Sequence, residues 1–170
     1  MLQAARFGSA DAAKLLVTRL SSSSEGDGGA NGVGRDSIAN VVDDSGRTPL
    51  HCAAQSGHRA VVEVLTTVSS VDVNAADRSG RTSLHLAAGN GHSDVVRVLI
   101  AMPQIDIGVV DSSGETAVHY ASWRGYKGVV QLLSDAANVD MDAENSSGWT
   151  PNSIEKLGDD LLSWMLRAKA

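Results

Sequence analysis

The sequence is short of the residues that build disulfide frameworks and bulky cores. Of its 170 residues one is cysteine and three are proline, and aromatic side chains make up only 4%. A single cysteine excludes an internal disulfide and a zinc site made of several cysteines, and it is typical of a reducing compartment. Because 42% of the residues are apolar but few are aromatic, a core must consist mainly of Ala, Val and Leu. Such a core favours small, closely packed helices over a thick β-sandwich.

Positive charge and long apolar runs are also scarce. Lys and Arg number 14 against 20 Asp and Glu, which gives a net charge of −6, and no basic run reaches five residues. This balance argues against nucleic acid as the main partner. No apolar run approaches the roughly 18 residues that span a bilayer, and the first residues lack the features of a signal peptide. We therefore expect a cytoplasmic protein, with the nucleus as the alternative location, and no membrane partner.

The most informative feature that is present is an internal repeat. Glycine, threonine and histidine each return three or four times at a spacing of 34 residues, which is more agreement than chance provides. The positions that recur are Gly46, Gly80, Gly114 and Gly148; Thr48, Thr82, Thr116 and Thr150; and His51, His85 and His119. A period of this length indicates stacked structural units.

Each copy reads as one supersecondary unit. In "TPLHCAAQSG", Thr48 is placed to cap a helix, Pro49 occupies its first position, and Gly57 suits the left-handed conformation that ends it. The next stretch, "HRAVVEVLTTV", carries its apolar residues along one helical face, and "SSVDVNAADRSGR" ends in a turn signal. The sequence therefore predicts helix, turn, helix and a hairpin-like loop. One such unit cannot bury both helices, so neighbours must stack.

These residues resemble the ankyrin repeat. Its signature, D-x-x-G-x-T-P-L-H-x-A-A-x-x-G-H, is matched by "DDSGRTPLHCAAQSGH" and "DRSGRTSLHLAAGNGH", and "DSSGETAVHYASWRGY" keeps most of it. The opening "LQAARFG" aligns with "HCAAQSG". The resemblance implies an all-α ankyrin solenoid of about five helix-turn-helix units with hairpin loops, curved with a concave face.

The repeat also suggests how the chain is divided. We expect an abbreviated first repeat at 1–42, three ankyrin repeats at 43–76, 77–110 and 111–144, and a C-terminal capping repeat at 145–170. A Ser/Gly-rich insertion at 21–37 has the composition of a flexible surface loop, with a modified or partner-ordered arm as the alternative. Trp164 lies in an apolar stripe that is expected to pack in the cap.

The repeated histidines are the obvious candidates for chemistry, but their spacing argues against it. Equivalent residues on stacked helices lie about 8–10 Å apart, whereas zinc ligands must all reach within about 2.0–2.3 Å of one ion. The resemblance implies instead that each histidine forms hydrogen bonds within its turn and to the next repeat. Cys52 follows His51 directly, but adjacent helical residues do not face each other, which favours a core cysteine. We expect no metal, no cofactor and no enzyme activity.

Function is therefore expected on the surface that varies between copies. By resemblance, partner contacts come from the hairpin tips and the exposed ends of the first helices. Trp and Arg, which most often carry interface energy, are present there. The predicted partner-binding residues are Asp44, Arg47, Gln55, Arg78, Arg81, Asn90, Glu115, Trp123, Arg124 and Trp149.

We expect a monomeric, non-catalytic module that binds another protein through the hairpin tips and the concave face. Trp123, Arg124 and Trp149 are expected to form the anchor, and the arginines at 47, 78 and 81 to steer an acidic segment of the partner. For Trp149, covering the C-terminal cap is the alternative. Two other interpretations stay open: a structural or spacer segment of a larger multidomain protein, and a metal protein or enzyme that uses the histidines.

Overall fold

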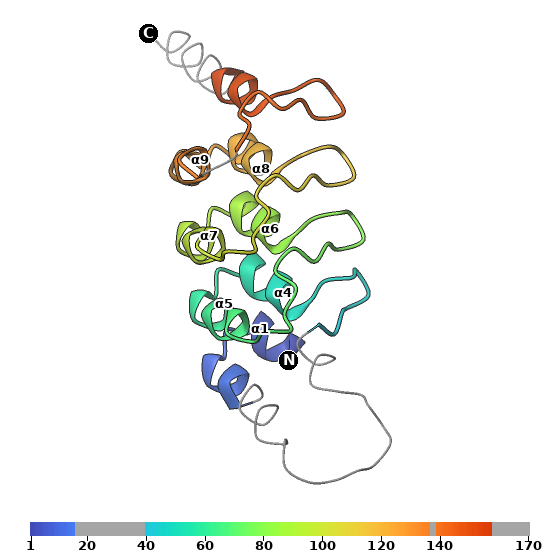
Figure 1. Ribbon diagram of the computed structural model, residues 1–170, viewed down its shortest axis with the longest axis vertical. Helices are drawn as coiled ribbons and strands as arrows, with labels where there is room; N and C mark the ends of the chain where they lie inside the picture. Colours follow the sequence, from blue (N-terminus) through green and yellow to red (C-terminus); the bar gives the residue numbers. More distant parts are fainter. Residues whose placement is uncertain (16–39, 137–138, 158–170) are drawn as a thin grey trace, which may run out of the picture.

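The computed structural model describes residues 1–15, 40–136 and 139–157, and within them it shows short helices and no strand (Figure 1). The sequence predictions for 21–37 and for Trp164 fall outside these residues. The first helices of successive repeats are α1 (Leu2–Arg6), α4 (Pro49–Gln55), α6 (Ser83–Gly89) and α8 (Ala117–Arg124). The second helices are α5 (Arg59–Thr66), α7 (Ser93–Ile100) and α9 (Lys127–Ser134). Another helical segment follows at 151–157.

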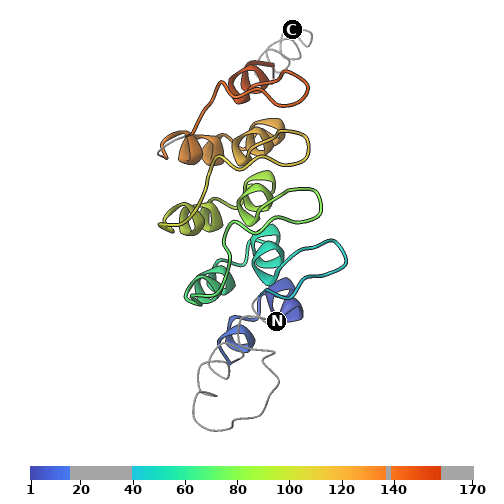
Figure 2. The same cartoon turned by 45° about the vertical axis from the view of Figure 1, so that its right-hand side comes forward.

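The helices form two columns. The first helices α1, α4, α6 and α8 contact one another in order, and α5, α7 and α9 do the same beside them. The hairpin loops project from the side of the first helices that faces away from the second helices (Figure 2). This arrangement is the predicted all-α ankyrin solenoid. Its concave face, as we use the term, comprises the hairpin loops and the exposed ends of the first helices.

Local chemistry explains where the first helices begin and end. Thr48 has extended backbone, and its backbone N–H donates to Nδ1 of His51 at 3.1 Å, while its Oγ1 accepts from the His51 backbone N–H at 3.4 Å. The two residues form a reciprocal capping box, and Pro49 occupies the first helical turn, where a missing N–H is harmless. Gly57 follows the helix with φ of +74°, a left-handed conformation that favours glycine.

The core consists of small aliphatic side chains between the two columns. Val61, Val62 and Leu65 of α5 are fully buried, and α7 buries Val95, Val96 and Leu99 in the same way. Burying one Val or Leu side chain contributes about 1.5–3 kcal/mol, so this repeated stripe supplies much of the drive to stack. Cys52 is part of the same cluster, as the sequence predicted.

The hairpin loops are joined by backbone hydrogen bonds. Arg78 N–H donates to the carbonyl of Ser45 at 3.1 Å, and Ser112 N–H donates to the carbonyl of Ser79 at 2.9 Å. Gly80, with φ of +78°, lies so close to the next loop that an added Cβ would stand 3.0 Å from the Ser112 nitrogen. The loops therefore stack as a continuous surface.

Candidate protein-binding face

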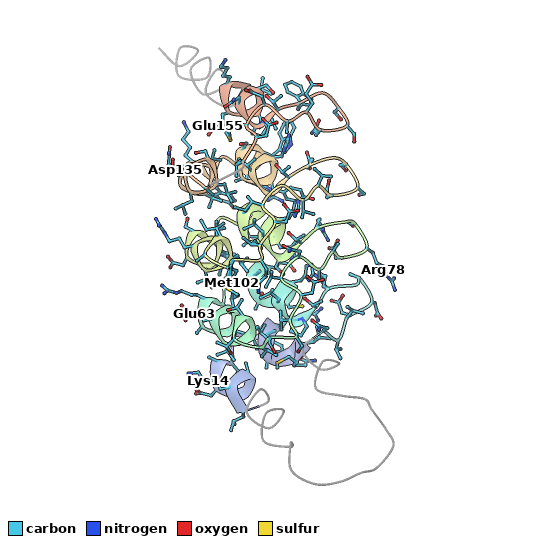
Figure 3. The ribbon with its side chains drawn as sticks, in the orientation of Figure 1. Lys14, Glu63, Arg78, Met102, Asp135 and Glu155 are labelled. Atoms are coloured by element: carbon cyan, nitrogen blue, oxygen red, sulfur yellow. The ribbon has the colours of Figure 1, made fainter. Side chains whose placement is uncertain are left out.

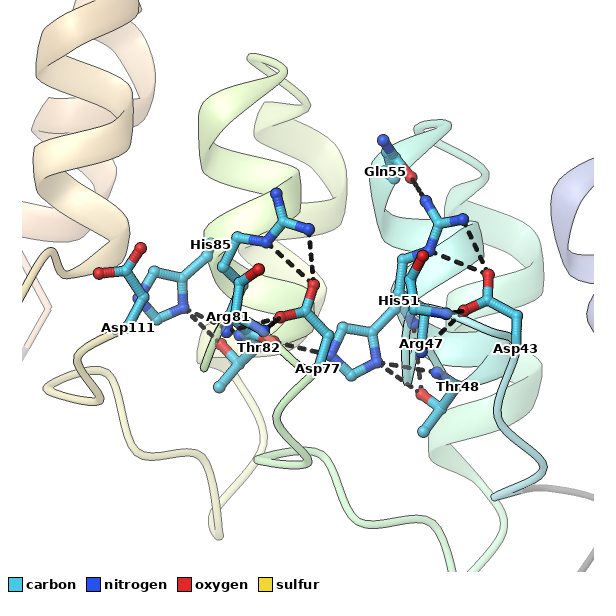
Figure 4. A network of polar contacts seen from close by, with 12 residues as sticks. Asp43, Arg47, Thr48, His51, Gln55, Asp77, Arg81, Thr82, His85 and Asp111 are labelled. Carbon is cyan, nitrogen blue, oxygen red and sulfur yellow. Dashed lines mark hydrogen bonds and ion pairs between the residues drawn. The ribbon is translucent and has the colours of Figure 1, made fainter. Parts of the chain in front are cut away.

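The buried histidines at 51, 85 and 119 join neighbouring repeats. His51 accepts from the Thr48 backbone N–H at Nδ1, and its Nε2–H donates to the carbonyl of Arg81 at 2.9 Å (Figure 4). The same pattern links His85 to the carbonyl of Glu115 and His119 to that of Trp149. A backbone N–H donor faces Nδ1 and a backbone carbonyl acceptor faces Nε2, and this pair of neighbours selects the neutral tautomer with its proton on Nε2. The predicted hydrogen bonds within the turn and to the next repeat are confirmed.

These histidines are poorly placed for chemistry. Burial lowers the pKa of His51 and of His85, although the backbone hydrogen bonds work against it. Burial also raises the pKa of the Cys52 thiol, so that it stays protonated near neutral pH. Across the part of the chain that the structure describes, no group of three His, Cys, Asp or Glu side chains could hold a metal ion. None of the helices in the same residues is both long and apolar enough to cross a membrane.

Arg47 and Arg81 are tied to carboxylates of their own repeats. Arg47 donates from Nη2 and Nε to Oδ2 of Asp43 at 2.8 and 3.0 Å, and Arg81 binds Asp77 in the same way at 2.7 and 2.9 Å (Figure 4). A further Arg47 bond reaches Oε1 of Gln55 at 2.9 Å. Burial alone would raise the pKa of Asp43, but hydrogen bonds from Arg47 and Ser45 lower it to about 2. The charge of both arginines is therefore largely compensated.

Three other predicted residues lie exposed on the face. Arg78 extends from the tip of its hairpin loop (Figure 3) and forms no ion pair with any described residue. Asp44 is exposed on the preceding loop. Asn90, at the end of α6, is exposed but donates from its amide to the carbonyl of Leu86 at 2.8 Å. These residues are accessible without being part of one cluster.

The repeats at 111–144 and 145–170 bring three predicted residues together. Glu115 stands where the two preceding copies have arginine, and its Oε1 accepts from the indole N–H of Trp123 at 2.8 Å. The same oxygen accepts from the amide of Asn145 at 3.2 Å. Trp123 packs edge to face on Trp149, with ring centroids 6.0 Å apart and planes at 68°. Arg124, the residue after Trp123, is exposed in the last turn of α8.

Trp123 and Trp149 remain open to solvent despite this contact. The exposed fraction is 45% for the Trp123 side chain and 37% for that of Trp149. Adjacent aromatic side chains with well-defined neighbours are already ordered before binding, which reduces the entropy that a complex costs. The pair and the Glu115 carboxylate therefore form a preorganised apolar patch with a negative edge. We call these three residues the tryptophan corner.

Sequence reasoning missed the role of Tyr120. Its hydroxyl donates to Oδ2 of Asp111 at 2.8 Å, and its ring meets His85 edge to face at 5.5 Å. The Asp111 carboxylate thereby gains a donor where Glu115, unlike arginine, provides no side-chain N–H. Burial raises the pKa of Tyr120, and the bond to Asp111 adds to the effect. The signal was present in the sequence, because the change from arginine to Glu115 and the change to Tyr120 occur in the same copy.

The fold and this face define a repeat solenoid in which recurring residues hold the stack, while some of the residues that vary, Trp123 and Arg124 among them, are exposed. Three family models match the chain, each described as ankyrin repeats: three copies at 1–77, many copies at 67–121, and a single repeat at 113–146. The chain belongs to the ankyrin repeat family, whose members are generally protein–protein interaction modules and typically not enzymes. No relative was found among curated proteins.

Proposed function

We propose that this protein binds another protein through its hairpin tips and concave face, with the tryptophan corner as the anchor. The observation that carries the proposal is the exposed, edge-to-face pair of Trp123 and Trp149. Tryptophan is the side chain most enriched among residues that dominate binding energy, and its large apolar surface releases water on contact. Neither position needs an exposed tryptophan to build a repeat, since the earlier copies use smaller or polar residues there.

The charged residues around the corner refine the expected contacts. Arg78 and Arg124 form no ion pair with a described residue, so they are the cations that an acidic segment of the partner would meet first. Arg47 and Arg81 keep their carboxylate partners, so they contribute shape and N–H donors to the face more than net charge. We therefore assign the steering role to Arg78, not to all three arginines of the hairpins.

The test is the loss of binding on removal of the anchor. The full chain is immobilised, partners are captured from the cell of origin, and the affinity of each captured protein is then measured for variants. Trp123→Ala is expected to weaken binding by about 2 kcal/mol, or roughly thirty-fold. Arg97→Ala serves as the control, because Arg97 is exposed on α7 in the column of second helices. A captured protein that binds wild type and Trp123→Ala equally would contradict the proposal.

A further inference from the structure

We propose that the tryptophan corner accepts an arginine side chain of the partner. This inference rests on the proposed function, because it specifies which partner group occupies the anchor. It adds a basic contact to the acidic segment that is proposed to meet Arg78 and Arg124. Three observations carry it: the charge environment of Glu115, the orientation of the Trp123 and Trp149 rings, and the exposure of both rings to solvent.

Glu115 has a negative charge that no described residue neutralises. Its two donors, the indole N–H of Trp123 and the amide of Asn145, are both uncharged and both bind the same oxygen, Oε1. The ion pairs among described residues involve Asp43, Asp77 and Glu63 but not Glu115. In the repeat before, the position equivalent to Glu115 is Arg81, which forms an ion pair with Asp77. The second carboxylate oxygen of Glu115, Oε2, thus remains available as an acceptor for a group of the partner.

The two tryptophan rings favour a positively charged group, as the Glu115 carboxylate does. Indole faces attract cations through their quadrupole, most strongly among the aromatic side chains. Because Trp123 points its N–H at the carboxylate, a group stacked on its face lies beside a negative charge. Trp149 stands at 68° to that ring and supplies a second wall. An acidic side chain in this place would meet like charge and a repelling ring face.

Arginine fits the corner better than lysine. A guanidinium is planar, stacks on an aromatic ring, is weakly hydrated, and can donate an N–H in its own plane to a carboxylate oxygen. A lysine ammonium is a compact, strongly hydrated charge that must lose more water to occupy the same place. Arg124 follows Trp123 in the chain but points about 100° away around α8, and it forms no ion pair with Glu115.

The inference can be tested without the partner. The full chain, labelled with ¹⁵N, is titrated at low ionic strength with hexa-arginine, hexa-lysine and hexa-glutamate peptides while the indole N–H signals are followed by NMR. Hexa-arginine is expected to shift the signals of Trp123 and Trp149 saturably. Hexa-lysine should bind more weakly, and hexa-glutamate should leave both signals in place. Equal affinity for hexa-lysine and hexa-arginine would overturn the assignment of arginine.

Two variants separate the site from general attraction to an acidic protein. Glu115→Gln keeps the oxygen that accepts from Trp123 but removes the charge, and it is expected to weaken hexa-arginine binding at least five-fold. Asp94→Asn makes the same change of charge on exposed α7 and should have no such effect. Equal losses in both variants, or none in Glu115→Gln, would overturn the inference. If Trp123→Ala still weakened partner binding in that case, the proposed function would stand without this inference.

Discussion

The indole rings of Trp123 and Trp149 meet edge to face across two repeats, at a centroid distance of 6.0 Å. Trp123 lies in the last turn of α8, and Trp149 belongs to the hairpin loop of the following copy. The carbonyl of Trp149 also receives the Nε2–H of His119, so backbone and side chain of one residue both join the two repeats. The tryptophan corner is therefore a part of the stack as well as a surface.

The ring contact should be measurable as a coupling in stability. Trp123→Ala, Trp149→Ala and the double variant form a cycle in which only the shared contact is non-additive. Aromatic pairs contribute about 0.5–1.5 kcal/mol beyond burial, and we expect a coupling in this range from urea unfolding. Trp123→Ala combined with Ala60→Gly, on the exposed side of α5, should be additive. A coupling near zero for the tryptophan pair would show that the rings do not hold each other.

The buried histidines predict a loss of stability in mild acid. The folded protein holds His51 and His85 in their neutral form with lowered pKa values, mainly because of burial. Below the unfolded pKa of 6.5 the unfolded chain therefore binds more protons than the folded chain. Stability is thus retained above pH 6.5 and lost as the pH falls toward the folded values, by at most about 1.4 kcal/mol per histidine and pH unit.

Urea unfolding between pH 7.5 and 5 checks this prediction, together with NMR titration of the imidazole protons. Asp43 and Asp77 have lowered pKa values and remain charged over this range, so they do not obscure the effect. The His51 and His85 signals should titrate below pH 6.5 or only on unfolding. A stability that is constant down to pH 5, or an imidazole midpoint above 6.5, would contradict it.

The repeat frame could be predicted from the sequence because each part of it depends on local rules. Thr48 and Pro49 fix the start of α4 by capping chemistry, and the spacing of Val61, Val62 and Leu65 fixes the buried face of α5. The structural role of the histidines could be predicted in the same way, since a residue that recurs at the same position in successive repeats is expected to hold neighbouring repeats together.

Side-chain partners on the face could not be predicted in this way, because they depend on what the neighbouring copy leaves open. Arg47 looked like a free cation, yet the tight turn of the hairpin places Asp43 against it, four residues earlier. Glu115 and Trp123 are eight residues apart and meet only because a loop and a helix end lie side by side. The copy-to-copy changes marked the face that we propose for binding, but only the structure shows which of the changed residues contact one another.

Ser122 should be a position where a smaller side chain stabilises the protein. Its hydroxyl oxygen is buried and has no hydrogen-bond partner among the described residues. The two preceding copies have Ala54 and Ala88 there, both fully buried. An unsatisfied buried hydroxyl costs about 1–3 kcal/mol, so Ser122→Ala is expected to raise the free energy of unfolding by about 1 kcal/mol. Thermal and urea unfolding measure this change.

The reverse substitution in the copy before provides the control. Ala88→Ser places a hydroxyl at the equivalent buried position and should destabilise by a similar or larger amount. A loss of stability in Ser122→Ala would show that the hydroxyl has a partner in solution.

Gly89 should resist replacement by alanine even though it lies within a helix. Alanine is preferred to glycine there by about 1 kcal/mol, but a Cβ at Gly89 would stand 2.9 Å from Cδ1 of Tyr120 and 3.5 Å from its Cβ. An aromatic ring bonded to Asp111 and packed on His85 cannot move aside easily. Overpacking costs about 1–3 kcal/mol, which matches or exceeds the gain, so Gly89→Ala is expected to be neutral or destabilising.

The same substitution should change sign once Tyr120 is removed. Tyr120→Leu restores the side chain that the preceding copy has at Leu86 and opens the space over Gly89. In that background Gly89→Ala is expected to stabilise by up to about 1 kcal/mol, the helix preference alone. The four proteins of the cycle are compared by urea unfolding at one pH. If Gly89→Ala stabilises both backgrounds equally, Tyr120 does not occupy this space, and packing against the next repeat does not require glycine at this position.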